Sequence, residues 1–121
     1  MIEEETTGST DREALLLAME RRDPERALGF YADDAELRVV NGDLPGSPEF
    51  GLRGRAEIGR YLRAVFDNDA PRRIEVEVCG EDRVVFAEDC EYPDGARVLV
   101  RTTLELVDGR ILRHTDVVGR A

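Results

Sequence analysis

The sequence predicts a single α+β domain, in which about three N-terminal helices pack on a curved, mainly antiparallel sheet. Two observations predict this class. Most of the segments with helical periodicity lie in the first half of the chain, whereas alternation at period two dominates the second half. Apolar residues make up 41% of the 121 residues, which is enough to fill one core. A twisted sheet with helices on one face forms a half-open cone, and we expect its interior to be a small-molecule pocket.

The N-terminal segment predicts a leader followed by a helix. Residues 1–8 are acidic, contain Thr and Gly and have no apolar period, so we expect a disordered leader and a folded domain over 9–121. Ser9 or the adjacent threonine can cap the first helix. Its apolar face contains Leu15 and Met19.

A second, shorter helix and the first strand are predicted next. Asp23 and Pro24 are typical of an N-cap followed by proline at the first helical position, and the apolar pattern carries this helix to Tyr31. Residues 36–40 alternate at period two, so they predict a strand with Leu37 and Val39 on one face.

The remaining elements are a loop, a helix and four strands. Residues 41–54 contain two prolines and four glycines, which predicts a loop. Residues 55–67 return to a helical apolar stripe. The four strands are predicted at 73–79, 84–91, 97–107 and 110–118. The Asp108-Gly109 pair is a strong hairpin signal, because both residue types accept a positive φ.

Composition and charge exclude several classes of function. The net charge of −10 repels nucleic-acid phosphate, and the arginines form no basic stripe, so we expect no nucleic-acid partner. No apolar run is long enough to cross a membrane, and the acidic N-terminus does not resemble a secretion signal, so we expect a cytoplasmic protein. One histidine and two separated cysteines fall short of the ligand count and spacing of a zinc site, so we expect no structural metal. In the predicted hairpin register, Cys79 lies near Val84 and Cys90 near Arg73, too far apart for a disulfide.

The last predicted strand carries the residues best suited to chemistry. Strand alternation places Leu112, His114 and Asp116 on one face, and Ile111 with Val117 on the other. If the first face is concave, His114 and Asp116 lie in a partly desolvated place, where a raised carboxyl pKa would suit proton abstraction. The alternative is that this face meets solvent or a partner subunit and that the pair is an ordinary polar rim.

Three motifs resemble the NTF2-like superfamily, and especially its SnoaL-like branch. They are the segments 30–35 (Phe-Tyr-Ala-Asp-Asp-Ala), 54–58 (Gly-Arg-Ala-Glu-Ile) and 108–116, in which Asp-Gly-Arg-Ile leads to His114-Thr-Asp116. Their order and spacing cover nearly the whole chain from Ser9. This superfamily includes enzymes as well as pocketed proteins without enzyme activity, so the fold alone does not define a function.

The enzyme branches of the superfamily differ in how well their catalytic residues match this sequence. In SnoaL-like cyclases an aspartate of the last strand, similar in position to Asp116, removes a carbon-bound proton, which makes Asp116 the base and His114 its hydrogen-bonding partner. The catalytic positions of steroid isomerases fall here on Val39, Leu15 and about Thr102, which argues against their mechanism. Epoxide hydrolase chemistry ranks lower, because Arg101 is expected to point away from the pocket.

The sequence therefore favours a protein that binds a hydrophobic small molecule, with a cofactor-independent cyclase or isomerase activity carried by Asp116 and His114. The alternative is a non-catalytic ligand-binding or dimerisation domain of the same fold. Expected pocket residues are Leu15, Tyr31, Val39, Phe50, Leu62, Phe66, Phe86, Val100 and Thr102. Tyr31 can also be a core ring, and Glu88 is expected at the pocket edge. Leu99, Val107 and Val117 on the outer sheet face predict a homodimer.

Overall fold

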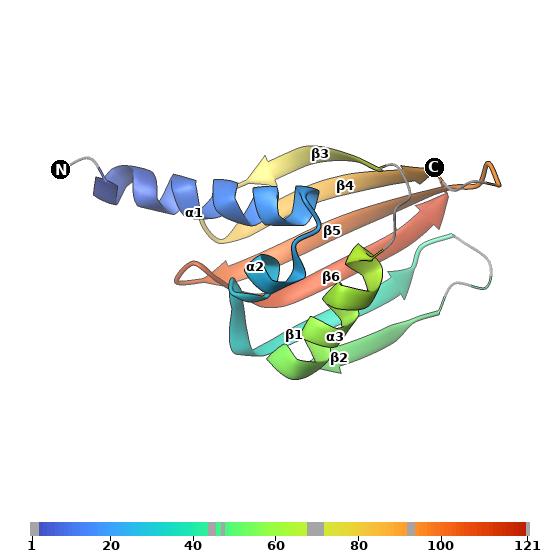
Figure 1. Ribbon diagram of the computed structural model, residues 1–121, viewed down its shortest axis with the longest axis horizontal. Helices are drawn as coiled ribbons and strands as arrows, with labels where there is room; N and C mark the ends of the chain where they lie inside the picture. The colour runs from blue at the N-terminus through green and yellow to red at the C-terminus, as the bar shows by residue number, and fades with distance from the viewer. Residues whose placement is uncertain (1–2, 44–45, 47, 68–71, 92–93, 121) are drawn as a thin grey trace.

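The domain consists of three helices and a six-stranded sheet within the residues that the computed structural model describes, which are 3–43, 46, 48–67, 72–91 and 94–120 (Figure 1). The side chains of residues 3–11 and 72 are not described. In chain order the elements are α1 (Glu3–Glu20), α2 (Pro24–Leu28), β1 (Tyr31–Asn41), β2 (Phe50–Arg53), α3 (Arg55–Phe66), β3 (Arg72–Cys79), β4 (Arg83–Glu91), β5 (Arg97–Val107) and β6 (Arg110–Arg120).

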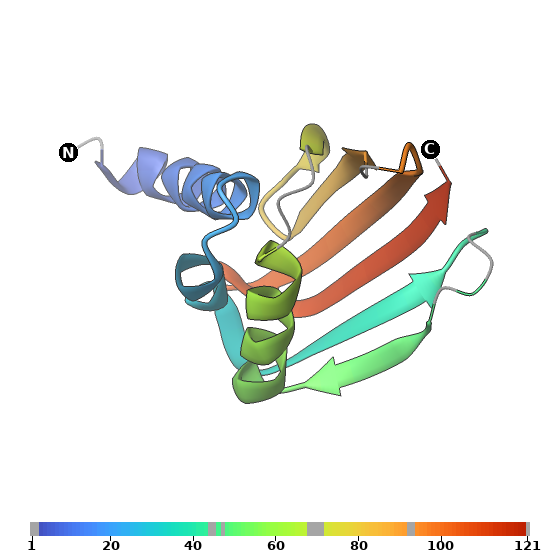
Figure 2. The same cartoon turned by 45° about the vertical axis from the view of Figure 1, so that its right-hand side comes forward.

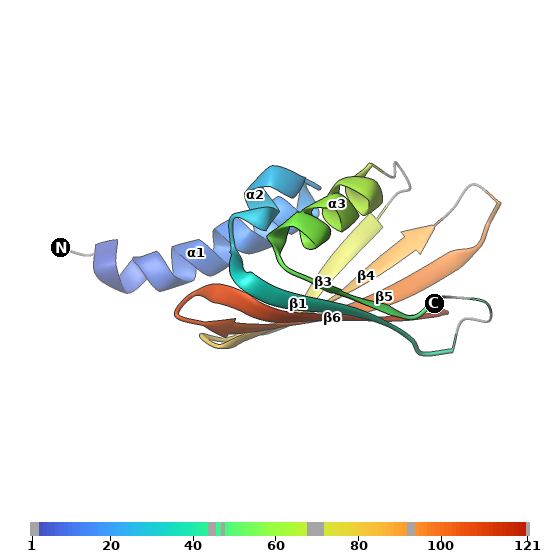
Figure 3. The ribbon, with the colours of Figure 1, turned by 90° about the horizontal axis from the view of Figure 1, so that it is seen from below.

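The strand order in the sheet is β2-β1-β6-β5-β4-β3. All neighbouring strands are antiparallel except β1 and β6, which run parallel. The three helices lie on one face of the twisted sheet, as Figures 2 and 3 show. This arrangement confirms the predicted α+β class, because one face of the sheet and the inner sides of the helices share a single core.

Helix α1 begins earlier than the sequence predicts. It runs from Glu3, so residues 3–8, expected to be a disordered leader, are helical. Three consecutive glutamates open this segment, and glutamate combines good helix propensity with a favourable interaction at the positive N-terminal end of a helix. The apolar side chains further along, including Leu15 and Met19, are buried as expected.

The boundary between α2 and β1 also differs from the prediction. The N-cap is confirmed, since Asp23 Oδ1 accepts a hydrogen bond from the Arg26 backbone N–H at 3.3 Å. However, α2 ends at Leu28, and Tyr31 begins a strand instead of ending the helix. Tyr31 pairs with Ile111 of β6, and the backbone N–H of Ile111 donates to the Phe30 carbonyl at 2.8 Å. Pairing with a distant strand, which local periodicity does not reveal, decides this boundary.

The predicted loop over residues 41–54 contains a short edge strand. β2 pairs antiparallel with β1, with Phe50 opposite Val39 and Leu52 opposite Leu37. At the end of this segment Gly54 has a φ of +87°, a conformation that glycine adopts without strain, and α3 starts at the next residue. The predicted third helix is confirmed with nearly the same bounds.

The four C-terminal strands are confirmed, but the face assignment at the start of β6 is wrong. The turn residues Asp108 and Gly109 have φ values of +52° and +79°, as the hairpin signal predicted. The β5–β6 register is irregular next to this turn: Leu106 pairs with Ile111, but the preceding Glu105 pairs with Arg113. As a result Ile111 is fully buried and Leu112 is 37% exposed, the reverse of simple alternation.

The register between β3 and β4, the strands that carry the two cysteines, is also irregular. Cys79 pairs with Val84 as expected, but a register shift between Val76 and Val78 places Cys90 opposite Arg72 instead of Arg73. Neither cysteine forms a disulfide; Cys79 is exposed and Cys90 is buried.

The outer sheet face presents apolar side chains among charged ones. Val117 is 40% exposed and Val107 is 56% exposed, while Leu99 is half-buried. A homodimer through this face stays a prediction. Among the helices of the described residues, none combines the length and apolar character that a membrane span requires.

Candidate functional site

Three adjacent strands bring polar side chains to the inner face of the sheet. In the ladder, Thr102 of β5 lies opposite Asp116 of β6, and Phe86 of β4 lies opposite Thr102. His114 is two residues before Asp116, so both project from the same face of β6. All three polar groups are buried: Thr102 is 2%, His114 4% and Asp116 7% exposed.

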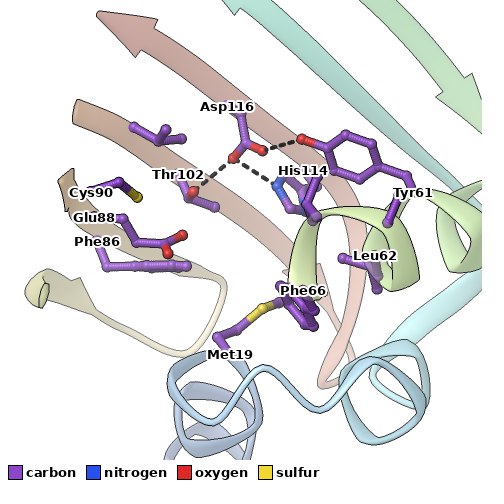
Figure 4. Close-up of a pocket in the computed structure, with 13 residues that line it drawn as sticks. Met19, Tyr61, Leu62, Phe66, Phe86, Glu88, Cys90, Thr102, His114 and Asp116 are labelled. Carbon is purple, nitrogen blue, oxygen red and sulfur yellow. Dashed lines mark hydrogen bonds and ion pairs between the residues drawn. The ribbon is translucent and has the colours of Figure 1, made fainter. Parts of the chain in front are cut away.

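These residues line a cavity of about 360 Å³ between the sheet, α3 and the end of α1 (Figure 4). Most of its wall is apolar, and the polar groups gather around Asp116. The lining residues are Met19, Tyr61, Leu62, Ala64, Val65, Phe66, Phe86, Glu88, Cys90, Val100, Thr102, His114 and Asp116. A pocket with an apolar wall and a few convergent polar groups is the usual form of a small-molecule site.

The carboxyl group of Asp116 accepts hydrogen bonds from three elements. Its Oδ1 accepts from Thr102 Oγ1 at 2.7 Å and lies 2.8 Å from His114 Nε2. Its Oδ2 accepts from the hydroxyl of Tyr61 in α3 at 3.2 Å. Figure 4 shows these contacts converging on Asp116 at one side of the cavity. A buried carboxylate with several donors is held in the ionised form.

A second tyrosine contacts the other side of the histidine ring. The Oη atom of Tyr31, in β1, is 2.6 Å from His114 Nδ1, and the two rings stack with centroids 6.0 Å apart. Tyr31 is fully buried and is not among the residues that line the cavity.

The electrostatics of the site favour an ionised Asp116 and protonated tyrosines. Burial raises the pKa of Asp116, but the charge of His114 and the hydrogen bonds from His114, Thr102 and Tyr61 outweigh burial and hold the pKa below its ordinary value. The expectation of a raised pKa for Asp116 is therefore wrong, because three hydrogen-bond donors surround the buried carboxylate. Burial, together with the charge of Asp116, raises the pKa of both Tyr31 and Tyr61 well above the ordinary range.

The first prediction concerns the pKa of Asp116. We expect carboxyl-carbon NMR to give a pKa below the ordinary value in the wild type and above the wild-type value in His114→Ala, because the largest pKa-lowering contribution is then lost. Since the folded-state pKa lies below the unfolded value of about 3.9, ionised Asp116 stabilises the fold at neutral pH. That contribution is lost as the pH falls below about 4 and through the folded-state pKa. Thr115→Ala, on the opposite face of β6, is the matched control, and an unchanged pKa in His114→Ala would contradict the assignment.

The structure brings together most of the residues expected to line the pocket. Besides Asp116 and His114, the cavity contains the expected Leu62, Phe66, Phe86, Val100 and Thr102. The other four do not line the cavity: Leu15, Tyr31 and Val39 are buried in the hydrophobic core, and Phe50 is 38% exposed on β2. Simple burial of an apolar position could not distinguish core from cavity wall.

Tyr61 is the hydrogen-bonding partner of Asp116 that the sequence analysis did not single out. It belongs to the apolar stripe of α3, in which its hydroxyl is the one polar group among Ile58, Leu62, Val65 and Phe66. A hydroxyl on an otherwise apolar helix face was the feature of the sequence that could have indicated Tyr61. Phe50, expected in the pocket, packs edge to face on Tyr61 with ring centroids 5.8 Å apart, so it supports the ring from β2.

Two further polar residues, one in β4 and one in β5, lie on opposite faces of the sheet. Glu88, expected at the pocket edge, lines the cavity from β4. Arg101 points away from it, as expected, and forms an ion pair with Glu77 on the outer face at 3.1 Å. Within the described ranges, no group of three or more His, Cys, Asp or Glu side chains is arranged to hold a metal ion.

The helices, the six-stranded sheet and the cavity between them define a cone-shaped α+β protein of the NTF2-like fold. The model of the SnoaL-like domain family matches residues 13–114, and the chain belongs to this family. The matched region contains Tyr31, Tyr61, Thr102 and His114 but ends before Asp116. No curated protein matches the sequence.

Solved structures with low sequence identity share the fold. An NTF2-like protein of unknown function from Mesorhizobium loti is 18% identical, with a TM-score of 0.69, covering 92% of this chain and 93% of its own. A protein from Sphaerobacter thermophilus is 22% identical, with a TM-score of 0.67 and coverage of 88% and 91%. A Kribbella flavida protein described as a candidate ketosteroid isomerase is 20% identical, with a TM-score of 0.64 and coverage of 93% and 80%. At these identities the likeness shows the fold alone.

Proposed function

We propose that this chain binds a hydrophobic carbonyl compound in the cavity and catalyses a cofactor-independent cyclisation or isomerisation, with Asp116 as the general base. The observation that carries the proposal is a buried, hydrogen-bonded carboxylate in the wall of an otherwise mostly apolar cavity. Such a carboxylate is ready to accept a proton at neutral pH without first losing one.

The low pKa of Asp116 restricts the substrate. A weakly basic carboxylate removes a proton efficiently only from an acidic carbon, such as one between two carbonyl groups. Among the lining residues that the structure describes there is neither Lys nor Arg, so the site offers no strong cation to an anionic substrate. We therefore propose an uncharged, largely apolar β-dicarbonyl compound as the substrate class.

The proposed reaction uses two residues that face the cavity. Asp116 Oδ2 takes the proton from carbon, the C–H electron pair becomes an enolate, and the enolate oxygen accepts a hydrogen bond from the Tyr61 hydroxyl. In a cyclisation the enolate carbon attacks a third carbonyl, further along the same molecule, to form a carbon–carbon bond, and the resulting alkoxide takes the proton back from Asp116. In an isomerisation Asp116 returns the proton to a different carbon. Tyr61 is suited to the donor role because its raised pKa keeps it protonated.

The test is proton exchange, which requires no knowledge of the natural substrate. Hydrophobic β-diketones are incubated with the protein in D₂O, and loss of the proton between the carbonyls is followed by NMR. We expect saturable exchange above the buffer rate, and a decrease of about 10²-fold in Tyr61→Phe, which loses the donor but keeps the ring.

One outcome would contradict the enzyme proposal, and another would contradict the role of Tyr61 in it. Exchange at the buffer rate despite saturable binding of the diketone would support the alternative, a non-catalytic ligand-binding domain. Unchanged exchange in Tyr61→Phe would remove Tyr61 from the mechanism. Phe50→Leu is the matched control, because it perturbs the support of Tyr61 from β2 without removing a hydroxyl.

A further inference from the structure

A hydrogen-bonded chain runs from the buried core to the reacting carboxylate. It starts at Tyr31 of β1, passes through both ring nitrogens of His114 and ends on Oδ1 of Asp116, with contacts of 2.6 Å and 2.8 Å. β1 and β6 are the parallel pair of the sheet, so the chain crosses between two strands that lie far apart in sequence. Tyr31 lies outside the cavity wall and cannot contact a substrate there.

The direction of the hydrogen bonds follows from the ionisation of Asp116. A carboxylate can only accept, so His114 Nε2 carries a hydrogen and donates to Oδ1. In neutral His114 the Nδ1 atom is then an acceptor, and the Tyr31 hydroxyl donates to it. This hydrogen bond is the only one that the Tyr31 hydroxyl makes within the described residues. If Nδ1 carried a hydrogen instead, the buried hydroxyl would have no acceptor there.

The two oxygens of Asp116 are held differently. Oδ1 has two short contacts, to Thr102 and His114, whereas Oδ2 has one longer contact of 3.2 Å, to Tyr61. Because Oδ1 is anchored from the sheet, proton transfer at Oδ2 disturbs only the Tyr61 contact. The carboxylate therefore has one fixed oxygen and one oxygen free to exchange its partner.

We propose that Tyr31 is a positioning residue, which holds the His114 ring so that Nε2–H anchors Asp116 Oδ1 and leaves Oδ2 as the reacting oxygen. The identity of the reacting oxygen rests on the proposed function, but the positioning of Asp116 by Tyr31 through His114 does not. Tyr31 is thus tied to the site without contacting the ligand, as the orienting member of a hydrogen-bonded series.

The experiment is a double-mutant cycle read by the carboxyl-carbon pKa of Asp116 without substrate. The variants are Tyr31→Phe, His114→Ala and their combination, and the ring of Tyr31 is kept to preserve the core. Groups that face Asp116 are His114 on its own strand, Thr102 on β5, Tyr61 on α3 and Tyr31 behind the histidine. We expect Tyr31→Phe to raise the Asp116 pKa by about half a pH unit in wild type and by less than about 0.2 in His114→Ala.

Equal increases in both backgrounds would overturn the proposal, because Tyr31 would then act on Asp116 directly. No increase in wild type would also overturn it and leave Tyr31 as a core residue. Tyr61→Phe is the control, since its effect on Asp116 should be similar with and without His114. Nitrogen NMR adds an independent readout: the neutral form of the wild-type His114 ring should carry its hydrogen on Nε2, and a hydrogen on Nδ1 of that form contradicts the chain. If wild type exchanges no substrate protons, the proposed function fails while these measurements still decide the role of Tyr31.

Discussion

Asp116→Asn is expected to reduce the rate of carbon-proton exchange by about 10²–10⁴-fold, the usual contribution of a positioned general base. Asparagine keeps the size of the side chain and can still accept hydrogen bonds from Thr102 and His114, but it cannot take a proton at neutral pH. We therefore expect a loss in kcat with a small change in KM, measured by NMR exchange at several diketone concentrations.

Asp108→Asn is the matched control for this prediction. Asp108 lies exposed in the β5–β6 turn with a φ of +52°, a conformation that asparagine also tolerates, so the variant makes the same change in charge far from the cavity. Its exchange rate should equal that of the wild type. Thermal unfolding checks that Asp116→Asn is folded, and a folded, ligand-binding Asp116→Asn with the wild-type rate would exclude Asp116 as the base.

The second large effect is expected on stability, at two neighbouring residues of β6. Ile111→Ala should lower the free energy of unfolding by about 2–5 kcal/mol, because Ile111 is fully buried and alanine leaves a cavity. Leu112→Ala should lower it by about 0.5 kcal/mol, because Leu112 is 37% exposed. Urea unfolding, with the slope compared between variants, measures both values.

This pair tests the irregular register between β5 and β6 directly. Simple alternation from His114 places Leu112 inside and Ile111 outside, and so predicts the opposite ranking. Equal costs, or a larger cost for Leu112→Ala, would contradict the observed register. Because the register shift lies just before His114 and Asp116, it separates the core positions at the start of β6 from the cavity positions that follow.

Much of the fold could be predicted because its signals are local. The apolar stripe of α3, the Asp23-Pro24 cap and the Asp108-Gly109 turn each depend on residues within one element, and all three are confirmed. The inward direction of His114 and Asp116 was also available from alternation, once a concave sheet was expected.

Two of the predictions that failed depend on contacts with another element of the sheet. Tyr31 follows a helical pattern but joins a strand, because β6 pairs with it across the sheet. The loop before α3 forms β2 only because β1 offers it an edge. In neither case does the local sequence contain the partner that decides the outcome.

The amino-acid sequence by itself determined the α+β class, most of the elements, the inward position of Asp116 and His114, and much of the cavity wall. Only the tertiary structure decided the chemical environment of Asp116. Three donors from β5, β6 and α3 converge on its carboxylate and lower its pKa, whereas burial alone would have raised it. Periodicity indicates which face of a strand is buried, but the groups that meet there come from separate elements, and only packing brings them within hydrogen-bonding distance.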